Sequence, residues 1–261
     1  MTHPWFADAS RPRILAHRGL VTPEDSVVGI AENSFAAVAA AHAAGATYVE
    51  SDCHLTADGT VVLFHDDTLT RVTGDPRRIA EVELRELEDL MASRGGLITL
   101  THALEAFPAV RFNLDAKADG VEEQMARDIT PHAERVLVAS FSDQRRIRVL
   151  RAVAASGRGI LPATSAGART IARVVTAVSV RSERLLARTL SGLDALQVPE
   201  RRGAVRIVTS RFVDAAHRHG VEVHVWTVNE PEDMRRLLAL GVDGLVTDRV
   251  DVGLKVAAEV A

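Results

Sequence analysis

Short apolar runs alternate with longer amphipathic stretches along the chain. The runs are four to seven residues long and rich in Val, Ile and Leu, which is typical of strands that are buried on both faces. We expect strands at Arg13–His17, Tyr48–Asp52, Arg111–Asp115, Arg135–Ser140, Arg158–Leu161, Ala195–Val198, Glu222–Val228 and Gly244–Asp248. Helical periodicity and end signals predict helices at Asn33–Ala44, Val121–Ile129, Ser142–Ala155, Ala168–Val178, Arg211–His219 and Glu232–Leu240.

Helices between successive strands predict a parallel sheet with right-handed crossovers. Eight such units favour a closed α/β barrel, the TIM (β/α)8 fold, and an open doubly wound sheet is the alternative. No low-complexity linker divides the sequence. We therefore expect one barrel domain over residues 1–261, a usual length for this fold.

The alternation is interrupted after the second predicted strand. Asp58 and Gly59 stand between two apolar runs and tolerate positive φ, so they predict a hairpin. The chain then turns back antiparallel and brings His65 near Glu50 and Asp52. The charged segment that follows, about residues 66–99, is interpreted as an insertion over the barrel mouth.

Composition narrows the class of protein. The chain has 31 Lys and Arg against 35 Asp and Glu, a net charge of −4, which argues against bulk electrostatic capture of nucleic acid. The single cysteine, Cys53, excludes an intramolecular disulfide and fits a reducing compartment. Met1–Arg13 lacks the apolar run of a signal peptide, and no apolar stretch is long enough to cross a bilayer. We expect a cytoplasmic protein without stable membrane insertion.

Charged residues gather at the predicted carboxyl ends of the strands, where barrel enzymes place their active sites. Glu50 and Asp52 lie two residues apart on one strand, and Asp115 and Lys117 lie two apart at the end of the next predicted barrel strand. Converging carboxylates repel one another, and a hard divalent cation such as Mg²⁺ or Ca²⁺ relieves that repulsion. Zinc is disfavoured because the sequence has no Cys/His cluster at a zinc spacing.

The order of these motifs resembles the glycerophosphodiester phosphodiesterase family. The resemblance spans both ends of the chain, over about 230 residues. It is carried by Ile14–Gly19, Glu32–Ser34, Glu50–Gly59, His65–Asp66, Val225–Asn229 and Gly241–Asp248. It implies a TIM barrel that hydrolyses glycerophosphodiesters to an alcohol and glycerol 3-phosphate in a metal-dependent reaction, a hydrolase of lipid and glycerol metabolism.

The resemblance also implies roles for single residues. It makes His17 and His65 the general acid–base pair, and Glu50 and Asp52 metal ligands. Asp115 stands where the family usually has Glu, so it becomes the third ligand with a side chain one methylene shorter.

Lys117 and Arg18 then offer positive charge to the phosphate. Trp226 is a candidate apolar wall for the glycerol carbons, with Phe64 or Phe141 beside it. The stretch Leu20–Ala31 is longer than the family leads us to expect and shows few helix signals.

Several alternatives stay open at the level of sequence. A lysophospholipase D-like activity uses the same acid–base pair, and a non-catalytic phosphoester-binding barrel keeps the fold. The sequence does not assign which histidine is the acid, nor whether water or the glycerol 2-hydroxyl attacks. The headgroup, the choice between Mg²⁺ and Ca²⁺ and the oligomeric state are also left open.

Overall fold

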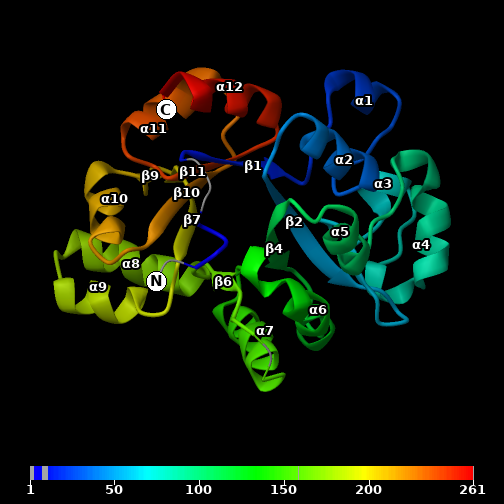
Figure 1. Ribbon diagram of the computed structural model, residues 1–261, viewed down its shortest axis with the longest axis horizontal. Helices are drawn as coiled ribbons and strands as arrows, with labels where there is room; N and C mark the ends of the chain where they lie inside the picture. The colour runs from blue at the N-terminus through cyan, green and yellow to red at the C-terminus, as the bar shows by residue number, and fades with distance from the viewer. Residues whose placement is uncertain (1–2, 8–10, 158, 261) are drawn as a thin grey trace.

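In the computed structural model, which describes residues 3–7, 11–157 and 159–260, eight parallel strands form a barrel at the centre of the molecule, with helices around it (Figure 1). The strands are hydrogen-bonded in the order β6-β5-β4-β2-β1-β11-β10-β7. They are β1 (Arg13–His17), β2 (Tyr48–Leu55), β4 (Arg111–Ala116), β5 (Val136–Ala139), β6 (Ala163–Thr164), β7 (Ala195–Pro199), β10 (Glu222–Trp226) and β11 (Gly244–Thr247).

The two ends of this order meet, so the sheet closes on itself. A parallel bridge joins Ser165 to Ala195. Beside it, the Asp194 N–H donates to the Thr164 carbonyl at 3.0 Å and the Ala166 N–H to the Ala195 carbonyl at 3.2 Å. The predicted barrel is therefore confirmed against the open sheet.

One predicted strand is wrong. Of the run Arg158–Leu161, Arg158 lies outside the described residues, and residues 159–161 are irregular. Ile160 and Leu161 are 44% and 49% exposed. Pro162 has no N–H to donate, and the chain joins the sheet directly after it, in β6. The apolar run was thus a surface connection and not a buried strand.

Helices form the outer layer, and most follow the predicted segments. Ser142 caps α7 by accepting a hydrogen bond from the Arg145 N–H, and Pro231 begins α11, as expected. The helices outside the barrel are α2 (Phe35–Ala43), α5 (Leu100–Ala106), α6 (Glu122–Ile129), η3 (Thr130–Arg135), α7 (Asp143–Ala155), α8 (Ala168–Ser179), α9 (Glu183–Leu190), α10 (Ser210–His217), α11 (Pro231–Ala239) and α12 (Val250–Val260).

Helix α12 was not predicted, because Gly253 interrupts the helical periodicity of its sequence and glycine disfavours a helix. The structure explains that glycine. A Cβ at position 253 would lie 2.7 Å from Ile14 Cγ2, so its absence lets α12 pack directly on β1. The first loop also differs from expectation, since Thr22 caps a short helix, α1 (Pro23–Val27).

The hairpin after β2 is confirmed. Strand β3 (Val61–Leu63) pairs antiparallel with β2, and Gly59 in the turn has a φ of +82°. The segment that follows has its own buried cluster of apolar side chains, including Phe64 and Leu87. Its elements are α3 (Thr70–Thr73), η1 (Ile79–Glu81), α4 (Leu84–Met91) and η2 (Ala92–Arg94), on the right of Figure 1.

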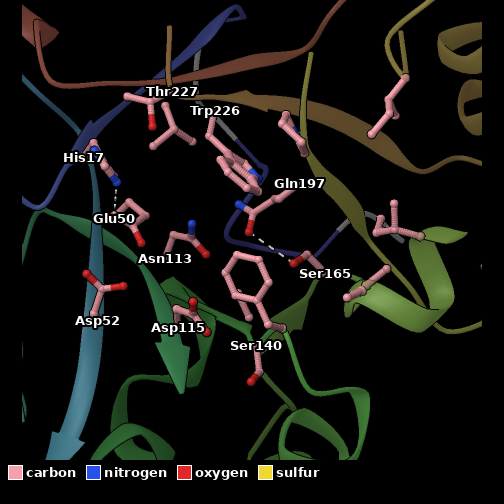
Figure 2. Close-up of a pocket in the computed structure, with 18 of the residues that line it drawn as sticks. His17, Glu50, Asp52, Asn113, Asp115, Ser140, Ser165, Gln197, Trp226 and Thr227 are labelled. Atoms are coloured by element: carbon pink, nitrogen blue, oxygen red, sulfur yellow. Dashed lines mark hydrogen bonds and ion pairs between the residues drawn. The ribbon is translucent and has the colours of Figure 1, made fainter. Parts of the chain in front are cut away.

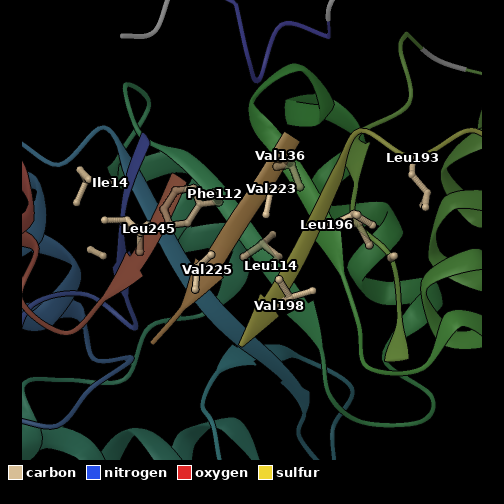
Figure 3. Close-up of a cluster of buried hydrophobic side chains, with 14 of the residues drawn as sticks. Ile14, Phe112, Leu114, Val136, Leu193, Leu196, Val198, Val223, Val225 and Leu245 are labelled. Carbon is tan, nitrogen blue, oxygen red and sulfur yellow. The ribbon is translucent and has the colours of Figure 1, made fainter. Parts of the chain in front are cut away.

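Alternate residues of each strand face opposite sides of the barrel wall. One set, including Phe112, Leu114, Val223 and Val225, belongs to the main core between the strands and the helices (Figure 3). The other set faces the barrel interior. The interior therefore holds a second apolar cluster around Leu15, together with the polar residues of the site described below.

Trp5 belongs to the interior cluster and is fully buried. Its indole Nε1 donates to the Phe112 carbonyl at 3.1 Å, and the Tyr48 hydroxyl donates to the Trp5 carbonyl at 3.0 Å. Beside it, Arg13 Nε donates to Glu222 at 2.7 Å. Strands β1, β2 and β4 begin at this end, so Trp5 closes the amino-terminal end of the barrel.

Among the described residues, no helix is both long and apolar enough to cross a membrane.

Replacing Trp5 with Ala should lower the free energy of unfolding by about 3–5 kcal/mol, because it leaves a large cavity inside the barrel. Urea unfolding followed by circular dichroism measures the change. Val180→Ala is the control, since Val180 is 62% exposed and its truncation should cost less than about 0.5 kcal/mol. A similar small cost for both variants would show that Trp5 does not support the barrel.

Candidate active site

One cavity of about 670 Å³ contains the sequence-predicted site residues. It opens at the end of the barrel where β1, β2, β4 and β10 finish. Figure 2 shows Glu50, Asp52 and Asp115 in this cavity, with His17 and Trp226 above them. The predicted residues that line it are His17, Arg18, Glu50, Asp52, His65, Asp115, Lys117 and Trp226.

His17 is the last residue of β1 and is held by a carboxylate. Its Nδ1 lies 2.6 Å from Asp248 Oδ1, and Asp248 also accepts a hydrogen bond from Asn229 at 2.8 Å. Burial raises the pKa of Asp248, but the hydrogen bonds from His17 and Asn229 outweigh it, and the pKa lies below its ordinary value. An ionised carboxylate only accepts, so Nδ1 donates. The other ring nitrogen, Nε2, lies 3.9 Å from Glu50 Oε2, beyond hydrogen-bond distance.

His65 is held in the same way from another part of the chain. Its Nδ1 donates to Asp66 Oδ1 at 2.6 Å, and its backbone carbonyl accepts a 3.2 Å hydrogen bond from His54 Nε2. Arg71 donates to the same Asp66 at 2.6 Å. These bonds from Arg71, with a smaller contribution from His65, lower the pKa of Asp66 to about 2 against the effect of burial. Both histidines therefore keep Nε2 for the cavity.

Arg71 also belongs to a network of ion pairs that extends to the buried carboxylate of Asp52. Glu32 accepts hydrogen bonds from Arg71 at 2.7 Å and from Arg18 at 3.0 Å. Burial raises the pKa of Glu32, but these two guanidinium groups outweigh it and lower the pKa. Arg18 Nε also lies 3.2 Å from Asp52 Oδ2. The two arginines thus link the His65 side of the site to Asp52.

Lys117 lies between two of the three carboxylates. Its Nζ is 3.0 Å from Asp52 Oδ1 and 2.7 Å from Asp115 Oδ2. Burial lowers the pKa of Lys117, but the charges of Asp115 and Asp52 outweigh burial, and the pKa lies above its ordinary value. Lys117 is therefore the cation that balances these two groups directly.

Glu50 has no such partner. Burial raises its pKa well above the ordinary value, and the neighbouring charges of Asp52 and Asp115 raise it further. Three buried oxygen atoms in this region have no hydrogen-bond partner in the described part of the chain: Glu50 Oε2, Asp115 Oδ1 and Asn113 Oδ1. Unpartnered buried oxygens carry a desolvation cost, so this corner of the cavity favours a positive ligand.

The carboxylates are not arranged as a finished metal centre. Within residues 3–7, 11–157 and 159–260, no three His, Cys, Asp or Glu side chains form a group that could hold a metal ion. The Lys117 ammonium lies between Asp52 and Asp115 and takes one oxygen from each.

The apolar side of the cavity is partly as expected. Trp226 and Phe141 line it, with ring centroids 5.8 Å apart in an edge-to-face arrangement. Phe64 is wrong as a wall residue, because it is buried in the cluster of the 66–99 segment and does not line the cavity. Lys117 Nζ lies 5.1 Å from the Phe141 ring, which places this wall next to the charged groups.

Two residues next to Asp52 in the sequence, Cys53 and His54, do not line the cavity. His54 is buried and outside the cavity lining, and burial lowers its pKa. Cys53 faces the main core and is fully buried.

Sequence reasoning gave no role to Asp248, Asn229, Arg71 or Asn113, although Asn229 and Asp248 end two of the motifs that carry the family resemblance. Asn113 carried a signal, since it lies two residues before Asp115 on the same strand face, and it lines the cavity. The other three act through contacts between segments far apart in the chain, such as His17 with Asp248. No local pattern marks such contacts.

Comparison with known proteins gives a consistent result. Residues 17–252 match the sequence profile described as the Glycerophosphoryl diester phosphodiesterase family. The chain is 34% identical over 242 residues to the "Probable glycerophosphodiester phosphodiesterase 2" of Mycobacterium tuberculosis, covering 91% of this chain and 88% of that protein.

Solved structures show the same fold. A glycerophosphodiester phosphodiesterase from Thermotoga maritima is similar with a TM-score of 0.70 at 23% identity, covering 95% of this chain and 99% of that one. A phosphodiesterase from Oleispira antarctica, solved in complex with the product sn-glycerol-3-phosphate, is similar with a TM-score of 0.69 at 22% identity, covering 94% and 96%.

The Arg71 contact predicts a pKa change that nuclear magnetic resonance can follow. In Arg71→Met, the pKa of Asp66 should rise from about 2 towards its ordinary value, about 3.9, because the main hydrogen bonds that lower it are gone. The folded-state pKa is below the unfolded one, so Asp66 stabilises the fold above about pH 4 and loses this contribution as the pH falls towards 2. The variant should show less of that acid-dependent loss.

Arg77→Met is the matched control, because Arg77 makes the equivalent contact with Asp75 and lowers the pKa of Asp75 to about 2. It should raise the pKa of Asp75 and leave Asp66 unchanged. An unchanged Asp66 in Arg71→Met would contradict the assigned network.

Proposed function

Because the chain belongs to the glycerophosphoryl diester phosphodiesterase family, we propose that it hydrolyses glycerophosphodiesters to glycerol 3-phosphate and an alcohol. In this proposal His17 and His65 exchange the protons, Lys117 and Arg18 bind the phosphate, and Glu50, Asp52 and Asp115 hold a divalent cation. The substrate is a small molecule bound in the cavity at the end of the barrel.

The pairing of each histidine with a carboxylate carries the proposal. Both Nδ1 atoms lie 2.6 Å from an aspartate, Asp248 for His17 and Asp66 for His65. The two rings come from different segments and line the same cavity. A carboxylate on Nδ1 fixes the ring and its tautomer and stabilises the imidazolium. Two histidines with purely structural roles would not both need a carboxylate on Nδ1, and they would not need to line the same cavity.

Phosphodiester hydrolysis needs one proton acceptor and one proton donor. One of the two histidines, as the neutral imidazole, takes the proton of the attacking hydroxyl through Nε2. The other histidine, as imidazolium, gives a proton to the leaving alkoxide. The unperturbed pKa of histidine, about 6.5, suits both roles near neutral pH. The attacking oxygen bonds to phosphorus, the bond from phosphorus to the leaving oxygen breaks, and the alcohol leaves protonated.

The phosphate is an anion, so positive groups must face it. Lys117 supplies an ammonium that lines the cavity, and Arg18 supplies a planar guanidinium with N–H groups suited to phosphate oxygens. As the charge on the phosphate oxygens grows in the transition state, both groups stabilise it. Trp226 and Phe141 pack against the carbon atoms of the substrate.

The chemistry of the donor set fits Mg²⁺ or Ca²⁺. Both ions prefer oxygen ligands, and the unpartnered oxygens of Glu50 and Asp115 are of that kind. The raised pKa of Glu50 reflects burial and uncompensated repulsion, which a cation would relieve. When bound, the ion supplies charge stabilisation to the phosphate oxygens. The contacts of Lys117 with Asp52 and Asp115 would have to rearrange to admit it.

We expect His17→Ala and His65→Ala each to lower kcat/KM for glycerophosphocholine by about 10²–10⁴-fold, the usual contribution of a general acid or base. Release of glycerol 3-phosphate in a coupled assay measures the rates. His102→Ala is the control, since this exposed histidine stacks on Phe35 and does not line the cavity. Equal turnover by wild type and both variants would refute the acid–base pair.

Removal of divalent ions with EDTA should abolish turnover, and added Mg²⁺ or Ca²⁺ should restore it. Calorimetric titration gives a readout that does not depend on activity. Glu50→Gln should bind the ion about tenfold more weakly or worse, because even the partners of metal ligands contribute that much. Asp119→Asn, outside the cavity lining, should bind it normally. Turnover that survives EDTA would refute the cation and leave the acid–base pair in place.

A further inference from the structure

Charge is distributed very unevenly along the chain. Residues 141–211, which run from the end of β5 to the start of α10, contain 14 arginines and four Asp or Glu, a net charge of +10. The other parts of the chain contain 17 Lys and Arg against 31 Asp and Glu, a net charge of −14. The overall charge of −4 therefore combines a strongly basic segment with an acidic remainder. A basic surface of this kind attracts anionic partners.

The fold gathers the basic segment on one side of the molecule. Helices α8, α9 and α10 lie on the left of Figure 1 with β9, whereas α3 and α4 of the acidic 66–99 segment lie on the right. The strands β8 (Arg201–Arg202) and β9 (Val205–Arg206) form a hairpin that follows β7 directly, at the open end of the barrel. The basic side therefore borders the cavity mouth, which α8 and this hairpin both line.

Five arginines on this side are exposed and have no ion pair in the described part of the chain. Arg169 and Arg173 lie one turn apart on α8, Arg201 and Arg202 form β8, and Arg211 is in the first turn of α10. We call these five residues the basic face. A cluster of four to eight basic residues is typical of proteins that bind anionic lipids.

The acidic residues of the basic segment do not neutralise this face. Glu200, next to the hairpin, pairs with Arg236 of α11 at 2.7 Å, and Glu183 pairs with Arg218 at 2.6 Å. The other two accept hydrogen bonds from backbone N–H groups: Asp143 and Asp194. The positive charge of the basic face is therefore available to a partner.

Two apolar side chains project into water beside the basic face. Phe141 follows β5 and is 58% exposed, and Val205 begins β9 and is 57% exposed. Cations around exposed apolar side chains suit a lipid bilayer, where the cations meet the phosphate groups and the apolar side chains enter the headgroup boundary. Nucleic-acid sites instead combine cations with aromatic side chains on which bases stack, and Val205 cannot stack.

We propose that the basic face docks reversibly on an anionic lipid bilayer, with the β8–β9 hairpin at the centre of the contact. The protein then lies on the membrane surface and does not span it. Repulsion keeps the 66–99 segment, with eight Asp and Glu against five Arg, away from the lipid. The docking goes beyond the proposed reaction, because it does not depend on which phosphodiester the cavity accepts.

Sedimentation of the whole chain with lipid vesicles measures the docking. Binding to vesicles of phosphatidylcholine with phosphatidylglycerol should be at least about tenfold stronger than binding to phosphatidylcholine alone, because each basic residue near an anionic surface contributes about fivefold. Raising the salt from about 0.1 M to about 1 M shortens the screening length from about 10 Å to about 3 Å and should release the protein. Equal binding to both vesicles, or binding to neither, would overturn the proposal.

A matched pair of double variants locates the contact. Arg173→Glu combined with Arg201→Glu reverses two charges of the basic face outside the cavity lining, and should weaken vesicle binding by at least about tenfold. Arg85→Glu combined with Lys255→Glu makes the same change in net charge at exposed positions of α4 and α12, and should bind much more strongly than the first pair. An equal loss in both would show that overall charge, and not this face, governs binding.

The apolar contact has its own test. Val205→Ser should weaken vesicle binding by about threefold or more, because it removes apolar surface that enters the lipid. Val27→Ser is the control, since Val27 is 88% exposed on α1, whose first turn is acidic, and its affinity should not change. Wild-type affinity in Val205→Ser would contradict the role of the hairpin.

A labelled single-stranded DNA distinguishes the two kinds of anionic partner. Fluorescence anisotropy under the same buffer conditions should show weaker binding to the DNA than to the anionic vesicles. Binding to the DNA without binding to the vesicles would assign the basic face to nucleic acid and overturn the proposal.

Discussion

Charge compensation among buried carboxylates is the constraint on which this site depends. Glu50, Asp52 and Asp115 face the same end of the barrel interior because they alternate with outward-facing core residues on β2 and β4. Desolvated carboxylates without partners are costly, so the fold must bring cations to them. Lys117 meets Asp52 and Asp115, and Arg18 meets Asp52, whereas Glu50 is left with an unpartnered oxygen. The site is therefore built around an incomplete balance of charge.

The alternation of outward-facing and inward-facing residues along each strand also gives the two faces of the barrel wall different roles. Outward-facing residues such as Leu114 and Val225 hold the helices, and inward-facing residues at the closed end pack around Trp5. The open end is thereby free to carry polar groups without loss of core. Elements added between the barrel strands complete the open end. The 66–99 segment provides Arg71 for Asp66, and the hairpin of β8 (Arg201–Arg202) and β9 (Val205–Arg206) lines one side of the cavity.

The sequence predicted most of the barrel because buried parallel strands leave a strong local signal. Seven of the eight expected strands overlap observed ones, and the exception, Arg158–Leu161, was an apolar loop before a proline. The residues that gather in the cavity were also foreseen, since strand ends meet at one rim of a barrel. The contacts that individual side chains make could not be predicted. Asp248 contacts His17, which lies 231 positions away in the sequence, and Phe64 packs in the apolar cluster of the 66–99 segment. Such choices depend on packing between distant segments, which no local pattern encodes.

The count of charges at the open end bears directly on the cation. The linked groups of the site include three permanent cations and six carboxylates: Arg18, Arg71 and Lys117 against Glu32, Glu50, Asp52, Asp66, Asp115 and Asp248. Even with His17 and His65 both protonated, the balance stays negative, and a phosphodiester adds another negative charge. Protonation of Glu50 removes one charge, in keeping with its raised pKa, but a protonated Glu50 attracts no phosphate. With one histidine neutral and the other protonated, a divalent ion would favour ionised Glu50 and bring the balance of these groups from −2 to zero before the phosphate binds, so the anionic substrate and the carboxylate cluster favour the same ligand.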